Sequence, residues 1–246
     1  MKAIILAAGF GRRLQPLTNI MPKSMVPVGG VPMLIRSMDK IADLGVDGFI
    51  IVTGHMASYI EGRIGSKYRD IPVTYVENIK YETTNNIYSL WMALPHIDDD
   101  VLLFECDLLY SQQLSGALGR YKADCVIVTS YFDPDTMNGS VIQIEDENTA
   151  VDLWLKSEQG DGFDYADKRK TVNIYKFSKA FFKAAMAPAL EAEIAAGNVN
   201  SYYEYVLKGI LESREWDARV LNVPDSWWRE VDDMDDLKRA EESDLI

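Results

Sequence analysis

The sequence predicts an α/β protein whose core is a mostly parallel sheet, and two patterns support this prediction. Short apolar runs of the kind that form buried strands occur at residues 2–6, 49–52, 73–76 and 101–104. Segments with apolar residues at helical spacing lie between them, at about 32–44, 55–64 and 84–94. Strands that alternate with helices run parallel, and ligands bind beyond their carboxyl ends. We therefore expect the loops at 7–23, 53–55 and 77–87 to share one cleft.

Composition limits the classes of partner and the compartment. The 246 residues fit a single domain, 1–246, and 48% hydrophobic residues suffice for a large core. A net charge of −13 argues against binding to nucleic acid or to an anionic membrane surface. The first apolar run is too short for membrane insertion. Cys106 and Cys125 form no Cys-x-x-Cys motif, as expected for reduced cysteines of a cytoplasmic protein.

The loop after the first strand carries small residues and fixed positive charge. Gly9 and Gly11 leave backbone N–H groups bare, and such groups form a concavity that binds anions. Arg12 or Arg13, together with Lys23, can add charge-assisted hydrogen bonds to phosphate oxygens. The spacing matches neither the P-loop nor the full dinucleotide fingerprint, so a phosphate site and an ordinary turn are equally compatible with it. A nucleoside triphosphate is the ligand that this chemistry suits.

Polar side chains gather at 84–89. Thr84, Asn85 and Asn86 precede an apolar-periodic segment, so one of them is expected to cap a helix. Capping explains one polar residue, but it explains two adjacent amides and Ser89 less well. An amide offers a donor and an acceptor on one rigid group, which suits a pyrimidine edge or a ribose hydroxyl.

Carboxylates mark two further places. Asp107 follows the strand at 101–104, and Glu105 lies two residues earlier as a reserve candidate. The second place is the acidic run 232–236, between a strand and a helix. Mg²⁺ takes one or two protein carboxylates and completes its shell with phosphate and water. An Asp that starts a turn or caps a helix gives the same pattern, so both interpretations stay open here.

The rest of the chain predicts a second group of elements. Further strands are expected at 126–128 and 172–177, an antiparallel pair at 141–144 and 151–155, and loops at 131–139 and 160–169. Helices are expected after Ser178, with a break at Pro188, and at 201–211 and 237–240.

Three blocks resemble a known family. L-A-A-G-F-G-R-R-L, P-L-T and M-P-K-S-M-V-P-V near the start are similar to the signature of nucleotidyltransferases that make nucleotide-activated sugars and alcohols. T-N-N-I-Y-S-L resembles a block of bacterial choline-phosphate cytidylyltransferases and their 2-aminoethylphosphonate-activating relatives. E-V-D-D-M-D-D-L at 230–237 resembles the family's E-x-D-x-x-x-D-L block. The resemblance spans the chain.

The resemblance implies a fold and separate binding roles for the two halves of the chain. The fold would be a Rossmann-like three-layer α/β sandwich of the nucleotide-diphospho-sugar transferase type, with a mixed, mostly parallel sheet and a small acceptor or lid subregion. Residues up to about 110 would bind the nucleotide, and residues from about 111 to 246 would bind the acceptor.

The resemblance also implies a reaction, which is transfer of CMP from CTP with release of pyrophosphate. Lys23 and Arg13 would stabilise charge on the phosphates, while Asp107 and Asp232 would hold Mg²⁺, with Asp233 as the alternative second ligand. The nucleotide would lie against Leu6, Ala7, Ala8, Gly9, Gly11, Gly54, Asn85, Asn86 and Ser89. No Ser-His or Cys-His pair is positioned for covalent catalysis, which favours direct in-line transfer.

Two kinds of acceptor fit the second half of the chain. Tyr175, Trp228 and other aromatic residues suit a cation–π cage for a quaternary ammonium. Asp133 and Asp135 instead suit a primary ammonium, which has three N–H donors. Where the choline enzymes carry an aromatic residue, this chain reads Asn-Gly-Ser at 138–140, which favours 2-aminoethylphosphonate over phosphocholine.

The basic triplet 168–170 supplies Lys168 as a candidate contact to the acceptor phosphonate, although a solvated loop explains it equally well. A sugar-1-phosphate enzyme using UTP or dTTP and a non-catalytic nucleotide-binding regulator are the alternative functions. The oligomeric state stays open, with a homodimer among the alternatives.

Overall fold

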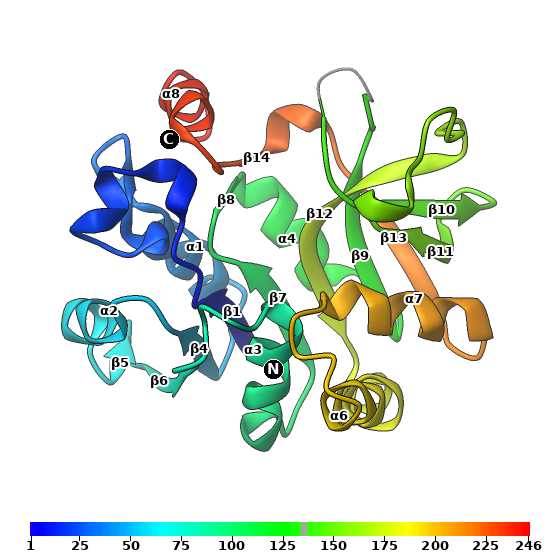
Figure 1. The fold of residues 1–246 in the computed structure, drawn as a ribbon, viewed down its shortest axis with the longest axis horizontal. Coiled ribbons are helices and arrows are strands. Elements are labelled where there is room, and N and C mark those ends of the chain that lie inside the picture. Colours follow the sequence, from blue (N-terminus) through cyan, green and yellow to red (C-terminus); the bar gives the residue numbers. More distant parts are fainter. Residues whose placement is uncertain (134–136) are drawn as a thin grey trace.

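The computed structural model describes residues 1–133 and 137–246, and a ten-stranded mixed sheet forms its centre (Figure 1). The strands lie in the order β10 (Val141–Glu145), β11 (Thr149–Trp154), β13 (Ala218–Asn222), β9 (Cys125–Ser130), β12 (Lys168–Phe177), β7 (Val101–Glu105), β1 (Lys2–Ala7), β4 (Gly48–Thr53), β6 (Ile71–Glu77) and β5 (Lys67–Tyr68).

The N-terminal part forms the predicted parallel core. β1 lies between β4 and β7, so that Leu6 is opposite Val52 on one side and Glu105 on the other. β6 continues the parallel arrangement beyond β4. These strands are almost wholly apolar because helices cover both faces of the sheet. Their carboxyl ends therefore meet at one edge, as the alternation of strands and helices predicts.

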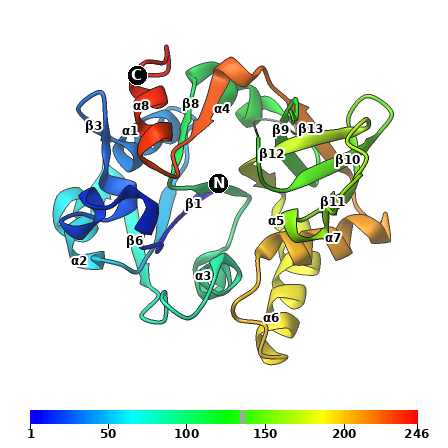
Figure 2. The ribbon, with the colours of Figure 1, turned by 45° about the horizontal axis from the view of Figure 1, so that its top comes forward.

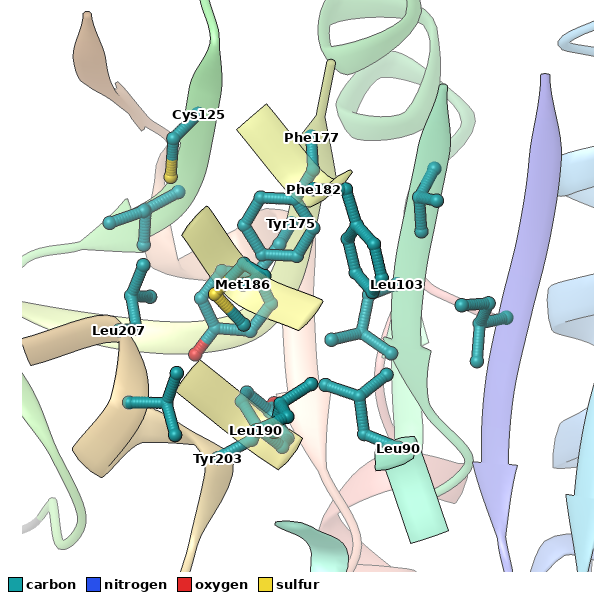
Figure 3. Packing of buried hydrophobic residues seen from close by; sticks show 14 of the residues in the cluster. Leu90, Leu103, Cys125, Tyr175, Phe177, Phe182, Met186, Leu190, Tyr203 and Leu207 are labelled. Atoms are coloured by element: carbon teal, nitrogen blue, oxygen red, sulfur yellow. The ribbon is translucent and has the colours of Figure 1, made fainter. Parts of the chain in front are cut away.

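Two layers of helices complete the three-layer sandwich. α1 (Met33–Ala42), α2 (Ala57–Ile64) and α4 (Gln112–Arg120) pack on one face, and α3 (Asn86–Ala93), α6 (Ala187–Ala195) and α7 (Tyr203–Ser213) pack on the other. Side chains alternate along β1, so they point to opposite faces of the sheet. Ile5 lies in the first core cluster, under α1, α2 and α4, and Ile4 lies in the second core cluster, under α3, α6 and α7. Figure 3 shows the second cluster, where Leu90, Leu190 and Leu207 surround Tyr175.

The second part of the sheet is more antiparallel than the first. β12 pairs antiparallel with β7 and β9, and also with β10. It begins at Lys168 rather than at the predicted Val172, so part of the expected loop is strand. The register shifts between Thr171 and Tyr175, and Asn173 there has a left-handed φ of 58°. This irregularity changes which side chains of β12 point to each face of the sheet.

The helical region after β12 follows the sequence prediction in outline. Ser178 caps α5 (Lys179–Phe181), as its hydroxyl accepts a hydrogen bond from Phe181 N. A π-helical turn at Phe182–Met186 then separates α5 from α6. Pro188 is the second residue of α6, which directly follows this π-helical turn, so the expected break is a local change of helical hydrogen bonding within a continuous helical segment.

The C-terminal segment returns to the N-terminal half (Figure 2). β14 (Trp228–Glu230) pairs antiparallel with β8 (Leu108–Tyr110), which the sequence reasoning missed. α8 (Met234–Glu241) follows and packs beside the hairpin of β2 (Pro27–Val28) and β3 (Val31–Pro32). Leu237 and Leu14 lie in one apolar cluster there. In the part of the chain that the structure describes, no helix is both long and apolar enough to cross a membrane.

Candidate active site

A cavity of 1280 Å³ opens beyond the carboxyl end of β7. Its wall is built from α3, the segment after β7, the loop before β10, the segment after β11, β12, the start of α7 and the C-terminal segment. Several of these elements were expected near the ligand edge, β12 among them through Lys168 and Tyr175, but α7 was not. The cavity therefore lies between the two halves that the sequence predicts.

Lys23 is the centre of the charged cluster at this cavity. Its ammonium lies 2.7 Å from Asp107 Oδ2 and 2.8 Å from Asp232 Oδ1. The lysine is 8% exposed. Burial alone would lower the pKa of Lys23, but the two carboxylates outweigh burial and raise it. Burial would raise the pKa of Asp232, but Lys23 and Arg13 hold it below its usual value. Lys23 and Asp232 are therefore charged at neutral pH.

A short pair of strands brings the two carboxylates together. β8 begins directly after Asp107, and β14 ends two residues before Asp232. The β8–β14 pairing places Glu230 opposite Leu108, and Val231 N–H donates to the carbonyl of Asp107 at 2.9 Å. Residues more than a hundred positions apart thus share one site because of a ladder that local patterns do not reveal.

Glu230 is a member of the cluster that the sequence reasoning did not assign. Asp107, Glu230 and Asp232 offer ligand atoms that all lie within 4.8 Å of one another. Burial raises the pKa of Glu230 to about 7, partly opposed by Lys170 and reinforced by the neighbouring Asp carboxylates. The spacing of two residues along an extended segment could have linked Glu230 to Asp232, whereas its place beside Asp107 depends on the β8–β14 pairing.

Asp232 and Asp233, between which the sequence left the choice of second metal ligand open, have different surroundings. Asp233 is the N-cap of α8, and its Oδ1 accepts hydrogen bonds from the N–H groups of Asp235 and Asp236, both at 2.9 Å. Asp236 reciprocates by accepting from Asp233 N. Asp232 instead points to Lys23 and to Arg13, whose Nη2 is 2.9 Å away. Capping therefore accounts for Asp233.

The loop after β1 approaches Lys23 through glycine. Gly11 has a φ of +73°, and a Cβ there would lie 2.7 Å from Lys23 Cβ. At Gly54 a Cβ would lie 2.6 Å from the carbonyl oxygen of Ala8, so the two predicted nucleotide-site segments are in contact. Gly9 is exposed and a Cβ there would meet open space. Leu6, Ala7 and Ala8 are buried below this loop.

The polar block at 84–89 divides into structural and cavity-lining residues. Asn85 caps α3 by accepting a hydrogen bond from Asn86 N at 2.8 Å. The Ser89 hydroxyl accepts from Asn78 Nδ2 at 3.2 Å and is buried. Asn86 lines the cavity, and its Oδ1 accepts from Tyr203 N at 3.0 Å. Asn86 therefore joins the start of α3 to the start of α7.

Asn86 also holds a pair of buried carboxylates. Its Nδ2 donates to Glu105 Oε1 at 3.2 Å and to Glu204 Oε2 at 3.4 Å. Both glutamates line the cavity. Burial raises the pKa of Glu204, although hydrogen bonds and Lys170 oppose the effect. Burial and the charges of Asp107 and Glu204 raise the pKa of Glu105 well above its usual value. Glu204 carries no sequence motif, and only its place in the fold identifies it.

The predicted acceptor residues fall in different places. Trp228 lines the cavity and is buried. Tyr175 is wholly buried in the apolar cluster of Figure 3, edge-on to Tyr203, and does not line the cavity. The Lys168 ammonium lies 5.1 Å from the centroid of the Phe163 ring and also stands outside the lining. Asp133 does not belong to the lining, and Asp135 lies outside the described residues.

The carboxylate cluster fits a divalent cation by its chemistry. Its donors are carboxylate oxygens, which Mg²⁺ prefers. Asp107 Oδ1 is buried, and among the described residues it has no hydrogen-bond partner. Lys23 already places one positive charge between Asp107 and Asp232. Asp107, Glu230 and Asp232 are thus the residues that would hold the ion.

Comparison with known proteins places the chain among nucleotidyltransferases. Residues 3–197 match the family model of the MobA-like NTP transferase domain. The chain is 30% identical over 242 residues, 98% of its length, to a CMP-5′-(3-aminopropyl)phosphonate synthase of Streptomyces rubellomurinus, and it spans 38% of that protein. It spans half or less of several other curated relatives that it matches.

Two further similarities involve cytidylyltransferases. The chain is 33% identical over 115 residues, 45% of this chain and 44% of the relative, to a 2-aminoethylphosphonate cytidylyltransferase of Lancefieldella rimae. The solved structure of a CTP:phosphocholine cytidylyltransferase from Streptococcus pneumoniae superposes with a TM-score of 0.79 at 23% identity, covering 98% of this chain and 97% of that one. At that identity the likeness confirms the predicted fold and carries no argument about substrate.

Proposed function

The chain belongs to the family of MobA-like NTP transferase domains, and from this membership we propose that it is a Mg²⁺-dependent cytidylyltransferase. The reaction moves CMP from CTP to a small aminoalkyl phosphonate or phosphate, with 2-aminoethylphosphonate as the preferred acceptor, and releases pyrophosphate. An oxygen of the acceptor phosphonate forms a new bond to the α-phosphorus of CTP while the bond from that phosphorus to the pyrophosphate oxygen breaks.

The observation that carries this proposal is the position of Lys23 between Asp107 and Asp232, next to the loop that contains Gly9 and Gly11. A reaction of this kind needs positive charge where negative charge develops, held in place before the substrate arrives. Lys23 is positioned by two carboxylates and is almost fully buried, so it is preorganised. When bound, the metal ion would supply further stabilisation of charge on the α-phosphate.

The other residues take roles that follow from their places. Arg13 is two-thirds exposed beside Asp232, so it can turn toward the leaving pyrophosphate without leaving a buried charge unpaired. Gly9 presents bare backbone to open space, where phosphate oxygens can approach its N–H. Asn86 lines the cavity and offers an amide for the nucleoside or the acceptor. We place Asn85 and Ser89 behind Asn86 as residues that position it.

Carboxylates in the cavity support a primary ammonium on the acceptor. Glu105 and Glu204 share the amide of Asn86 and face the cavity. A primary ammonium has three N–H groups that can donate hydrogen bonds to carboxylate oxygens, whereas a trimethylammonium has none. These glutamates thus take the role that the sequence suggested for Asp133 and Asp135. The relatives that act on aminoalkyl phosphonates are consistent with this acceptor class.

Phosphocholine is the second candidate acceptor. Trp228 and Tyr202 both line the cavity, and aromatic faces attract a quaternary ammonium. Two rings among the described lining residues make a poorer cage than a full aromatic enclosure. We therefore rank phosphocholine below 2-aminoethylphosphonate.

The test is pyrophosphate release with CTP and Mg²⁺ against 2-aminoethylphosphonate, phosphocholine and glucose-1-phosphate. We expect the highest kcat/KM with 2-aminoethylphosphonate. A preference for phosphocholine would reverse the ranking of acceptors, and turnover with the sugar alone would exclude both. Binding of CTP by calorimetry without pyrophosphate release from any acceptor would indicate a nucleotide-binding regulator instead of an enzyme.

A further inference from the structure

Lys170 of β12 is a buried lysine in the wall of the cavity. It is 3% exposed, and its ammonium donates a hydrogen bond to the carbonyl of the adjacent Thr171 at 2.9 Å. The ring centroid of Trp228 lies 5.8 Å from the same ammonium. Among residues 1–133 and 137–246, no ion pair within 4.0 Å is formed by Lys170. Lys170 acts on the carboxyl groups of Glu204 and Glu230 only beyond ion-pair distance, where it opposes the rise of their pKa values. A buried ammonium without an ion pair in the described residues is costly to maintain, so its presence in the wall of a cavity points to an anionic ligand.

A glycine makes room for this ammonium. A Cβ at Gly139 would lie 2.7 Å from Lys170 Nζ, so any side chain at 139 would displace the lysine. The loop is held at this distance by two contacts. Gln159 Nε2 donates to Gly139 O at 2.9 Å, and Thr171 donates through both its N–H and its hydroxyl to Ser140 O at 3.1 Å. The loop thus lies against the ammonium of Lys170, which itself bonds to the carbonyl of Thr171.

The other cationic side chains that line the cavity form ion pairs or are exposed. Arg13 pairs with Asp232, and Arg239 pairs with Asp236. Lys156 and Arg229 are exposed. The cavity also contains several carboxylates, which repel an anionic acceptor. A cation that is both buried and unpaired in the described lining is the group best able to overcome that repulsion, because low solvent exposure strengthens its field.

We propose that Lys170 binds the phosphonate or phosphate oxygens of the acceptor, an inference that rests on the proposed cytidylyltransferase function. The acceptor then lies with its anionic group against Lys170 and its ammonium toward Glu105 and Glu204. The carboxyl groups and the lysine line the same cavity, so this arrangement suits a zwitterionic acceptor. The lysine that the sequence favoured, Lys168, is two residues away and outside the lining.

The first test is the steady-state kinetics of Lys170→Met. Methionine keeps an unbranched side chain that is one atom shorter and removes the charge. We expect the KM for 2-aminoethylphosphonate to rise by about 10- to 100-fold, while the KM for CTP changes by less than about twofold. Lys176→Met is the matched control, since Lys176 lies on the same strand and its ammonium also donates to backbone carbonyls, of Gly119 and Tyr121. Its acceptor KM should not change.

The second test needs no turnover. Calorimetry with ethylphosphonate, which lacks the amine, should detect binding to the unaltered protein and to Lys176→Met, and none to Lys170→Met. Equal binding to all three proteins, or an acceptor KM unchanged in Lys170→Met, would overturn the proposal. A loss of binding in Lys168→Met alone would overturn it in favour of Lys168. If no acceptor supports pyrophosphate release, the proposed function fails, whereas the ethylphosphonate titration still decides the role of Lys170.

Discussion

The ammonium of Lys23 lies 2.7 Å from the carboxylate of Asp107, and both side chains are nearly inaccessible to solvent. This contact joins the loop after β1 to the end of β7. A second carboxylate, Asp232, completes the arrangement from the C-terminal segment. One lysine thus offsets the repulsion of two neighbouring carboxylates and joins three distant parts of the chain. Any cation that binds Asp107 and Asp232 must share them with Lys23.

Replacing Lys23 should change the response of the protein to Mg²⁺. In Lys23→Met Asp107 loses its counter-ion and Asp232 keeps only Arg13, and we expect a loss of about 3–5 kcal/mol of stability in EDTA. Mg²⁺ should restore more stability to this variant than it adds to the unaltered protein, because binding to the folded state raises the free energy of unfolding. Thermal unfolding with and without Mg²⁺ measures both effects.

The matched control for this prediction is Lys208→Met. It breaks an ion pair with Glu158 of equal length, 2.7 Å, and of similar exposure, at a distance from the carboxylate cluster. This variant should also lose stability, but Mg²⁺ should stabilise it no more than it stabilises the unaltered protein. Equal Mg²⁺ responses in the two variants would show that Asp107 and Asp232 do not bind the ion.

Adjacent aspartates should behave differently when each is replaced by alanine. Asp232→Ala removes a contact of Lys23 and Arg13, and we expect kcat to fall by at least about 100-fold in a folded protein. Asp233→Ala removes the cap of α8, which should cost about 1 kcal/mol of stability and leave kcat within a few-fold. Pyrophosphate release and urea unfolding separate the two effects. The reverse pattern would assign the catalytic role to Asp233.

The sequence predicted those site features that depend on local signals. The strand that ends near Asp107, the loop with Gly9 and Gly11, and the capping residue among Thr84, Asn85 and Asn86 each follow from neighbouring residues. The structure confirms these elements and the mixed α/β sandwich. Periodicity and turn chemistry suffice for such features because both act over a few residues.

The features that the sequence could not reveal depend on distant pairings. Glu230 joins Asp107 through the β8–β14 ladder, and Glu204 reaches the cavity because Asn86 bonds to the backbone at the start of α7. The choice between Lys168 and Lys170 depends on which residues of β12 face the cavity, and that strand carries a register shift. Neither a ladder between short strands nor a shift in register leaves a periodic pattern to detect.

Two glycines at the candidate nucleotide site should respond oppositely to alanine. Gly9→Ala adds a methyl group to open space, so stability should change by less than about 0.5 kcal/mol while the KM for CTP rises, because the methyl group obstructs the approach of the phosphates. Gly54→Ala places Cβ 2.6 Å from a backbone oxygen, so it should lose about 1–3 kcal/mol of stability. An unchanged KM for CTP in Gly9→Ala would remove Gly9 from the phosphate site.

The buried carboxyl of Glu204 should give the protein a characteristic pH dependence. Burial raises its pKa in the folded state above the ordinary value of 4.5, so between those two values the folded protein keeps a proton that the unfolded chain has released. Stability then falls as pH rises through this window, by up to about 1.4 kcal/mol per pH unit. Glu204→Gln cannot titrate, so its stability relative to the unaltered protein should increase with pH.

Urea unfolding from pH 5 to pH 8, in EDTA, measures this difference directly. Glu145→Gln is the control, because Glu145 is an exposed carboxylate paired with Arg214 outside the cavity. Its stability relative to the unaltered protein should not follow the same trend. A constant difference between Glu204→Gln and the unaltered protein across the range would mean that Glu204 is ionised in the folded state throughout. Glu204 would then already carry the negative charge that an acceptor ammonium requires, with no proton to release before binding.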